Sequence, residues 1–239
     1  MRPFFSYYGA KYTMAKHYGP PRSDVIIEPF AGSACYSTYW NVERAILCDV
    51  SPEICAVWRF LIQADASDIA SIPDAFDSFD EVAALPDGAR QLVGFWVAKG
   101  RAQPSQSLSP WYFKYRSGTN CSCWGRAVKR RLIDQLPQIR GWEIFNCDYR
   151  KAPEIKGAHW HIDPPYNNKA GQCYPYRGVD YQALAEWAKT RPGHVDVCEN
   201  DGANWLEFTP IASVVSTRGR RTGAVSLESV WSRFPDSAA

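Results

Sequence analysis

The feature that most limits the fold of this chain is an alternation of short apolar runs with helical segments. Apolar runs of strand length lie at residues 25–28, 45–48, 142–147, 159–162, 194–198, 211–217 and 228–231. Helices are expected after residue 34, from Pro52 onward and over 181–189. Strands that are separated by helices predict an α/β protein with a parallel sheet covered by helices on both faces.

The middle of the chain, residues 60–140, lacks this alternation and has the pattern of helical segments broken by prolines. The breaks fall at Pro73, Pro86, Pro104 and Pro110, and the clearest loop covers 102–110. We therefore expect one α/β domain made of 1–59 and 141–239, with a mainly helical region inserted between its two parts.

Composition is typical of an enzyme that folds without disulfide bonds. In the 239 residues, no apolar stretch approaches the ~20 residues that a membrane span needs, and the first residues lack the pattern of a signal peptide. We therefore expect a cytoplasmic protein that does not bind membranes. The eight cysteines are scattered, and Cys121 and Cys123 lack the partners and spacing of a zinc site, so we expect no metal.

A corner formed by Asp163, Pro164, Pro165 and Tyr166 comes directly after the apolar run at 159–162. The first proline biases Asp163 away from helix, and neither proline has an N–H to donate, so the local carbonyls are expected to stay available as acceptors. An acid, carbonyl acceptors and an aromatic ring suit a planar substrate with an amino group, such as a nucleobase. An ordinary surface turn is the alternative for so short a motif.

A turn of small residues, including Gly32 and Ala34, follows the apolar run at 25–28. Such a turn lets a ligand approach the backbone, and the next helix offers unpaired N–H groups. It is neither the dinucleotide fingerprint nor a phosphate loop, which argues against an oxidoreductase or an NTPase. Asp49 ends the next run about twenty residues after Glu28, where an acid commonly accepts from ribose hydroxyls; a helix-capping turn is the alternative.

These elements, in this order, resemble the D12-class, Dam-like DNA adenine methyltransferases of the alpha group. The N-terminal element, similar to the family's W-x-G-G-K, contains Tyr7, Tyr8, Gly9, Ala10 and Lys11. The turn that is similar to D-P-F-x-G-x-G contains Glu28, Pro29, Phe30, Ala31, Gly32, Ser33 and Ala34, and the D-P-P-Y corner is unchanged. The chain departs from the family pattern at four positions: Tyr7, Ala10, Glu28 and Ala34.

The resemblance implies a Rossmann-like sheet of the kind found in S-adenosylmethionine-dependent methyltransferases. It implies that S-adenosyl-L-methionine is bound by the N-terminal element, the small-residue turn, Asp49, Asp148 with Tyr149, and Asp163. The substrate would be adenine in double-stranded DNA, methylated on N6 after it flips out of the helix and stacks on Tyr166. The resemblance leaves open whether a cognate restriction endonuclease exists, and it favours a monomer or weak dimer in a bacterium or a phage-infected cell.

Charge is unevenly distributed although the net charge is only +2. Charged residues are all acidic from Asp65 to Asp87 and mostly basic from 111 to 140. In the resembled family the region that reads DNA lies here, while a solvated helix face is the alternative. The candidate DNA contacts are Lys114, Arg116, Asn120, Arg126, Lys129, Arg130, Arg131, Asn168, Lys169, Arg218, Arg220 and Arg221.

Other functions stay open from sequence alone. Cytosine-N4 methylation uses a similar tetrad, and a catalytically inactive DNA-binding relative is conceivable because of Ala10 and Ala34. An RNA-modifying enzyme is a further alternative. His159 and His161 alternate along one strand and are more typical of packing than of a metal site. The decisive expectation is that the Asp163 corner and the Gly32 turn, both at strand carboxyl ends, open into one cleft.

Overall fold

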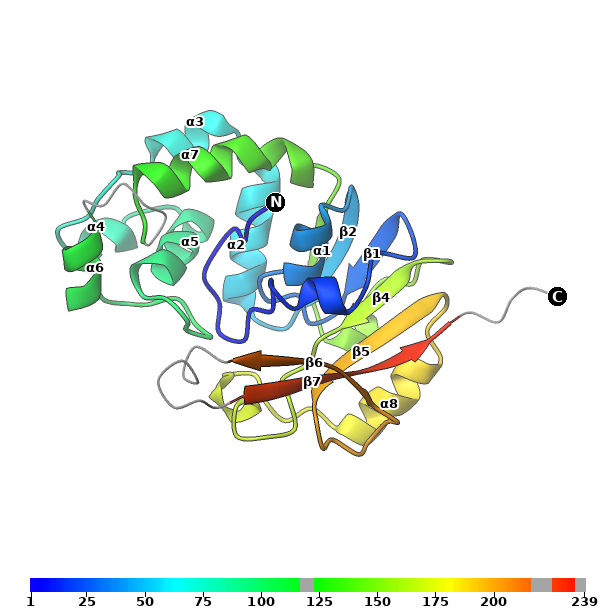
Figure 1. The fold of residues 1–239 in the computed structure, drawn as a ribbon. Coiled ribbons are helices and arrows are strands. Elements are labelled where there is room, and N and C mark those ends of the chain that lie inside the picture. The colour runs from blue at the N-terminus through cyan, green and yellow to red at the C-terminus, as the bar shows by residue number, and fades with distance from the viewer. Residues whose placement is uncertain (117–122, 216–224, 235–239) are drawn as a thin grey trace.

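The computed structural model describes residues 1–116, 123–215 and 225–234 (Figure 1). A seven-stranded sheet with the order β3-β2-β1-β4-β5-β7-β6 forms its centre. The strands are β1 (Val25–Glu28), β2 (Arg44–Asp49), β3 (Glu143–Asn146), β4 (His159–Ile162), β5 (His194–Asn200), β6 (Thr209–Val215) and β7 (Val225–Arg233). Each lies where the sequence pattern predicts a strand, with ends that differ by a few residues.

The sheet is parallel from β3 to β5, as expected, but β7 departs from the prediction. Strand β7 is antiparallel to both β5 and β6. The reason is the length of the connection: the stretch 216–224 between β6 and β7 is shorter than the dozen or more residues that a parallel crossover needs. The expectation of a wholly parallel sheet is therefore wrong for β7.

The described helices include the three that the sequence predicts beside the strands: α1 (Cys35–Trp40), α2 (Pro52–Gln63) and α8 (Tyr181–Lys189). Helix α2 begins at Pro52 because Ser51 caps it, accepting from the N–H of Ile54 at 3.3 Å, while proline at the first position needs no N–H partner. Asp180 caps α8 in the same way, accepting from Ala183 N–H at 3.0 Å.

The described part of residues 60–140 is helical, as predicted, and contains no strand. Its helices are α3 (Ala66–Ser71), α4 (Phe79–Ala83), α5 (Asp87–Val97), α6 (Pro110–Tyr115) and α7 (Arg126–Gln135). Short 3-10 turns occur at η1 (Ala15–His17), η2 (Leu136–Ile139), η3 (Tyr149–Lys151) and η4 (Gly171–Cys173). In Figure 1 helices α3 to α7 cluster beside α2, away from α8.

Alternating residues of the strands send their side chains to two hydrophobic clusters, one on each face of the sheet. Ile26 and Leu47 belong to a cluster that contains Trp58 of α2, whereas Ile27 and Ile46 belong to the cluster of α8. The first cluster also includes Trp124 and other residues of the helical region. The inserted helices therefore extend a core that begins at the sheet.

No helix in the three described ranges combines the length and the apolarity that a membrane crossing requires. The cysteines described there are free thiols.

Candidate active site

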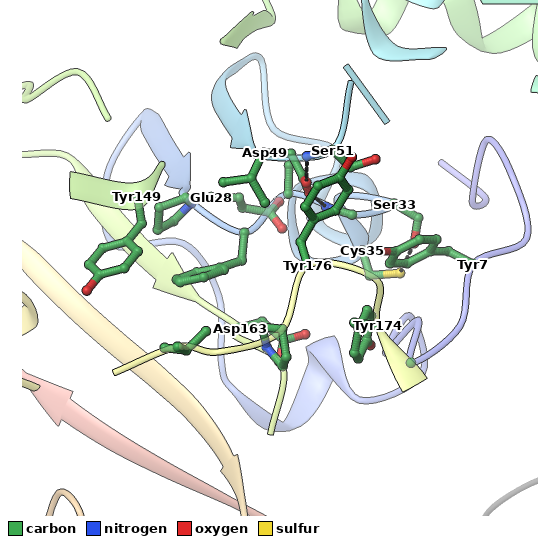
Figure 2. Close-up of a pocket in the computed structure, with 18 of the residues that line it drawn as sticks. Tyr7, Glu28, Ser33, Cys35, Asp49, Ser51, Tyr149, Asp163, Tyr174 and Tyr176 are labelled. Carbon is green, nitrogen blue, oxygen red and sulfur yellow. Dashed lines mark hydrogen bonds between the residues drawn. The ribbon is translucent and has the colours of Figure 1, made fainter. Parts of the chain in front are cut away.

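A pocket of about 380 Å³ opens at the carboxyl ends of the parallel strands (Figure 2). Both the Asp163 corner and the Gly32 turn contribute to its lining. The pocket lies beside the boundary between β1 and β4, where the strand order reverses, which is the usual ligand position in open α/β sheets. Its lining includes these predicted residues: Tyr7, Tyr8, Gly9, Ala10, Lys11, Glu28, Pro29, Phe30, Ala31, Gly32, Ser33, Asp49, Asp148, Tyr149, Asp163 and Pro165. Ala34, Pro164 and Tyr166 lie next to these residues in the chain but outside the lining.

Glu28 explains how helix α1 starts without a capping residue. Ala34, at the N-cap, has a left-handed backbone (φ 44°, ψ 52°) and makes no side-chain cap. The buried Glu28 instead accepts from the N–H of Ser37 at 3.0 Å, inside the first turn of α1. Burial raises the pKa of Glu28 to about 7 against this hydrogen bond. Glu28, which stands where the resembled family has an aspartate, thus has a structural partner.

Asp49 holds the small-residue turn against the end of β2. One of its carboxylate oxygens accepts from Gly32 N–H at 2.9 Å and the other from Ser51 N–H at 2.9 Å. Burial raises the pKa of Asp49 to about 6, although both hydrogen bonds oppose the rise. The carboxylate lines the pocket with lone pairs to spare, so it is placed to accept from a ligand hydroxyl as well.

Aromatic side chains form another part of the wall. The rings of Phe30 and Tyr149 stack at 5.3 Å between centroids. Next to them, Asp148 accepts from the backbone and the side chain of Arg150, at 3.0 and 2.6 Å. The Arg150 hydrogen bond lowers the pKa of Asp148, which therefore keeps its negative charge at the rim. Asp148 and Tyr149 thus lie in the pocket, where the resemblance places the adenine of the cofactor.

Lys11 joins the N-terminal element to the D-P-P-Y corner. Its ammonium lies 2.6 Å from a carboxylate oxygen of Asp163 and 3.5 Å from the centre of the Tyr166 ring. Burial alone would lower the pKa of Lys11, but Asp163 and Glu228 outweigh it and the pKa is raised. Burial raises the pKa of Asp163 even though Lys11 opposes the rise. Lys11, expected at the cofactor, thus contacts the residues expected to hold the substrate.

The carbonyls of the two prolines in the corner differ in their hydrogen bonding, although the sequence predicts that both are available as acceptors. The Pro165 carbonyl accepts from the Tyr181 hydroxyl at 2.7 Å. No hydrogen bond from another described residue reaches the Pro164 carbonyl. One lone pair of the Pro165 carbonyl is therefore already used, and the availability of the Pro164 carbonyl stays a prediction.

A segment that the sequence analysis did not assign to the site, 174–180, forms much of the remaining wall. The Tyr174 hydroxyl donates to the Tyr8 carbonyl at 3.2 Å, and the Tyr174 ring packs edge to face on the Tyr8 ring. In Figure 2, Tyr174 lies on the Tyr7 side of the pocket, and Tyr176 lies near Asp49 and Ser51. No motif in the sequence indicates that this segment reaches the pocket.

Glu228 was also missed. It lies on β7 and accepts from the Tyr166 hydroxyl at 2.5 Å, 62 residues away in sequence. No local motif marks it, because only the antiparallel placement of β7 brings it to the corner.

The position of Lys129 argues against one of the predicted DNA contacts. Lys129 is 8% exposed, and its ammonium donates to the carbonyls of Ala70 and Ile72 and lies 2.9 Å from Asp74. An ammonium so enclosed joins α7 to α3 and does not present itself to a phosphate. The prediction of a DNA contact at Lys129 is therefore not compatible with its position.

The acidic and basic stretches, separate in sequence, lie against each other in space. Arg126 is 3.3 Å from Asp74, and Arg116 is 2.6 Å from Asp77. These pairs neutralise part of the basic stretch. The proposed basic surface is thus smaller than the sequence suggests.

The other candidate DNA contacts differ in exposure. Lys114, Arg130 and Lys169 are exposed. The Arg131 guanidinium lies 5.2 Å from the centre of the Trp96 ring, and Asn168 accepts from Ala170 and Gly171 N–H within its own loop. The remaining candidates, Asn120, Arg218, Arg220 and Arg221, lie outside the described residues.

Three buried side chains, His159, His194 and Asp196, are close enough together to hold a metal ion. Both histidines place Nε2 near Asp196 Oδ2, at 2.9 and 3.0 Å. His159 Nδ1, however, accepts from Arg22 N–H at 3.3 Å, which leaves the proton on Nε2, directed at the carboxylate. This geometry is that of a hydrogen-bonded network at the opposite ends of β4 and β5 from the pocket.

Comparison with known proteins adds little to this geometry. No protein-family model matches the chain, and no curated protein matches its sequence. Among solved structures, the fold is similar to that of a Haemophilus influenzae protein proposed to be a methylase. The two share 8% identity with a TM-score of 0.35, over 93% of this chain and 85% of that one. So distant a likeness assigns neither a family nor a reaction.

Proposed function

We propose that this protein transfers a methyl group from S-adenosyl-L-methionine to the exocyclic N6 amino group of an adenine in duplex DNA. The observation that carries the proposal is that the Asp163 corner and the Gly32 turn open into one pocket of about 380 Å³. A donor bound along the Gly32 turn would there lie beside an amino group held at Asp163. The volume is within the range of small-molecule sites, roughly 300–1,000 Å³.

The pocket suits a cationic nucleoside cofactor. Carboxylates of Glu28, Asp49 and Asp163 line it, while the charge of Lys11 is engaged by Asp163. Asp49 would accept from the ribose hydroxyls, and the wall around Phe30 and Tyr149 would take the adenine. The cofactor, when bound, supplies a methyl group on a positively charged sulfur, which makes that methyl group a good electrophile.

The protein's own task is to position the amino group. An exocyclic amine is a weak nucleophile because its lone pair is delocalised into the ring. Asp163 and the Pro164 carbonyl would accept its two hydrogens and so direct the lone pair along the path of transfer. Positioning of this kind contributes several kcal/mol to lowering a barrier, out of the ~7–11 kcal/mol available from proximity.

The target base would leave the duplex and stack on Tyr166, at a cost of about a few kcal/mol that phosphate contacts offset. Lys114, Arg130 and Lys169 are exposed and are the cations that we propose for those contacts. Adenine is favoured over cytosine by Asp163 and by the alpha-group order of the motifs, which the resemblance implies.

The test is to express the chain and follow the methyl group. Ultraviolet crosslinking with labelled S-adenosylmethionine reports cofactor binding, and sequencing of DNA from expressing cells reports the modified base and its context. We expect labelling and N6-methyladenine within a short recurring sequence. Absence of both would overturn the proposal, modified cytosine would replace adenine as substrate, and labelling without any methylated nucleic acid would indicate an inactive relative.

A further inference from the structure

Strand β7 brings a buried carboxylate to the substrate side of the pocket. Glu228 is 6% exposed, and its Oε2 accepts from the hydroxyls of Tyr166, at 2.5 Å, and Tyr18, at 3.3 Å. The ammonium of Lys11 lies 3.5 Å from the same oxygen. A single oxygen atom is thus shared by three groups from distant parts of the chain.

A carboxylate in such a place is costly unless its charge is compensated and its lone pairs are used. Each partner of Glu228 lies in or next to the proposed site: Lys11 and Tyr18 line the pocket, and Tyr166 belongs to the D-P-P-Y corner. A leucine or valine would fill a strand position against a core more cheaply. The carboxylate is therefore best explained by what it does to these partners.

Lys11 makes the two contacts that a target base would need. It donates to Asp163 Oδ1, the acceptor proposed for the amino group, and it covers the face of the Tyr166 ring. A base cannot occupy both places while the ammonium does. A base that binds at Oδ1 and stacks on this face of the ring would displace Lys11, and Glu228 is the second carboxylate within its reach.

We infer that Glu228 is a positioning residue for the substrate step: it fixes the Tyr166 ring through its hydroxyl and takes the Lys11 ammonium when an amino-bearing base replaces it at Asp163. The inference rests on the proposed function. The proposed role concerns the substrate end of the pocket. Asp49 and the Gly32 turn, expected at the cofactor end, have no contact with Glu228 among the described interactions.

The experiment compares Glu228→Gln with wild type in cofactor binding and in methylation of a duplex that carries the sequence found by sequencing. Glutamine keeps the size of the side chain and removes its charge. We expect the Kd for S-adenosylmethionine to stay within twofold and kcat/KM for DNA to fall at least tenfold. The matched control is Glu186→Gln, the same change at a side chain that is 75% exposed on α8.

A second variant, Tyr166→Phe, removes the hydrogen bond from Tyr166 to Glu228 and leaves the ring. If Glu228 acts through that hydroxyl, part of its effect disappears in the Tyr166→Phe background, so the double variant loses less than the product of the two single losses. A fluorescent adenine analogue at the target position should also show weaker capture of the flipped base by Glu228→Gln.

The outcomes separate the two proposals. A wild-type protein that binds no cofactor and methylates no DNA overturns the proposed function itself. An active wild type with an unchanged Glu228→Gln variant overturns only the role of Glu228. Equal losses in cofactor binding and in methylation would also overturn it, since they would show a purely structural carboxylate.

Discussion

The ammonium of Lys11 lies 2.6 Å from a carboxylate oxygen of Asp163, although 152 residues separate them in sequence. This ion pair connects the N-terminal element to the D-P-P-Y corner across the pocket. Asp163, the acid that is expected to hold the amino group, thereby has a cationic neighbour that opposes the rise in its pKa and favours its ionised form. Both residues are therefore informative positions for substitution.

Asp163→Ala should reduce methyl transfer by about 100-fold or more, because the amino group loses the acceptor that orients its lone pair. Duplex binding should be largely kept, since phosphate contacts come from other surfaces. Transfer of labelled methyl groups and a gel-shift titration measure the two effects. The control is Asp201→Ala, at an exposed acid. Wild-type turnover of the Asp163 variant would reject its central role.

Lys11→Met should shift the pH dependence of methylation. The Lys11 charge lowers the pKa of Asp163, so its removal raises that pKa further. Less of Asp163 is then ionised near neutral pH, and the acid limb of kcat/KM moves to higher pH. The profile should be recorded from about pH 5 to 9, with Lys16→Met at an exposed lysine as the control. An unmoved acid limb would show that Asp163 is not the titrating group.

Cofactor affinity should fall as the pH drops through about 6. The raised pKa of Asp49, about 6, means that its carboxylate becomes protonated there and accepts more weakly from ribose hydroxyls. Calorimetric titration at several pH values measures the change. Asp49→Asn should remove the step near 6, whereas a step that persists near 7 and disappears in Glu28→Gln would instead belong to Glu28, whose pKa is about 7.

Gly32→Ala should destabilise the fold and narrow the pocket. Gly32 has φ +45°, and an added Cβ would lie 2.8 Å from a ring carbon of Tyr7. The backbone strain alone costs about 1–2 kcal/mol, and the overlap adds to it. Gly157→Ala is the matched control, because its φ is +77° and nothing lies within 4 Å. Chemical denaturation should show a larger loss for Gly32→Ala than for this control.

Substitutions of Lys129 and Arg130, both on α7, should differ in their effects on the free energy of unfolding. Lys129→Met removes an ammonium from the Ala70 and Ile72 carbonyls, and we expect a loss of about 2 kcal/mol in the free energy of unfolding. Arg130→Ala, at an exposed residue, should stay within about 0.5 kcal/mol.

In DNA binding, the proposed phosphate contact at Arg130 predicts a salt dependence whose slope is smaller by about one unit in Arg130→Ala. An unchanged slope would return Arg130 to the solvated helix face that the sequence left open.

Local patterns were sufficient for most of the secondary structure. The bounds of β4 and α8 are those that the sequence predicts, because a short apolar run and a capped, amphipathic segment are each encoded by neighbouring residues. The two corners could also be placed at one edge of the sheet, since parallel strands share the direction of their carboxyl ends. Substrate and cofactor identity still depend on the resemblance and await the experiments above.

Sequence by itself thus determined the strands and the two turns that open into the pocket. Only the tertiary structure decided that Glu228 contacts Tyr166, that Tyr174 rests on Tyr8, and that Lys129 is enclosed against Asp74. The physical reason is that such contacts join residues distant in the chain. They depend on how strands pair and helices pack, and a parallel β7 in place of the antiparallel one would have carried Glu228 elsewhere.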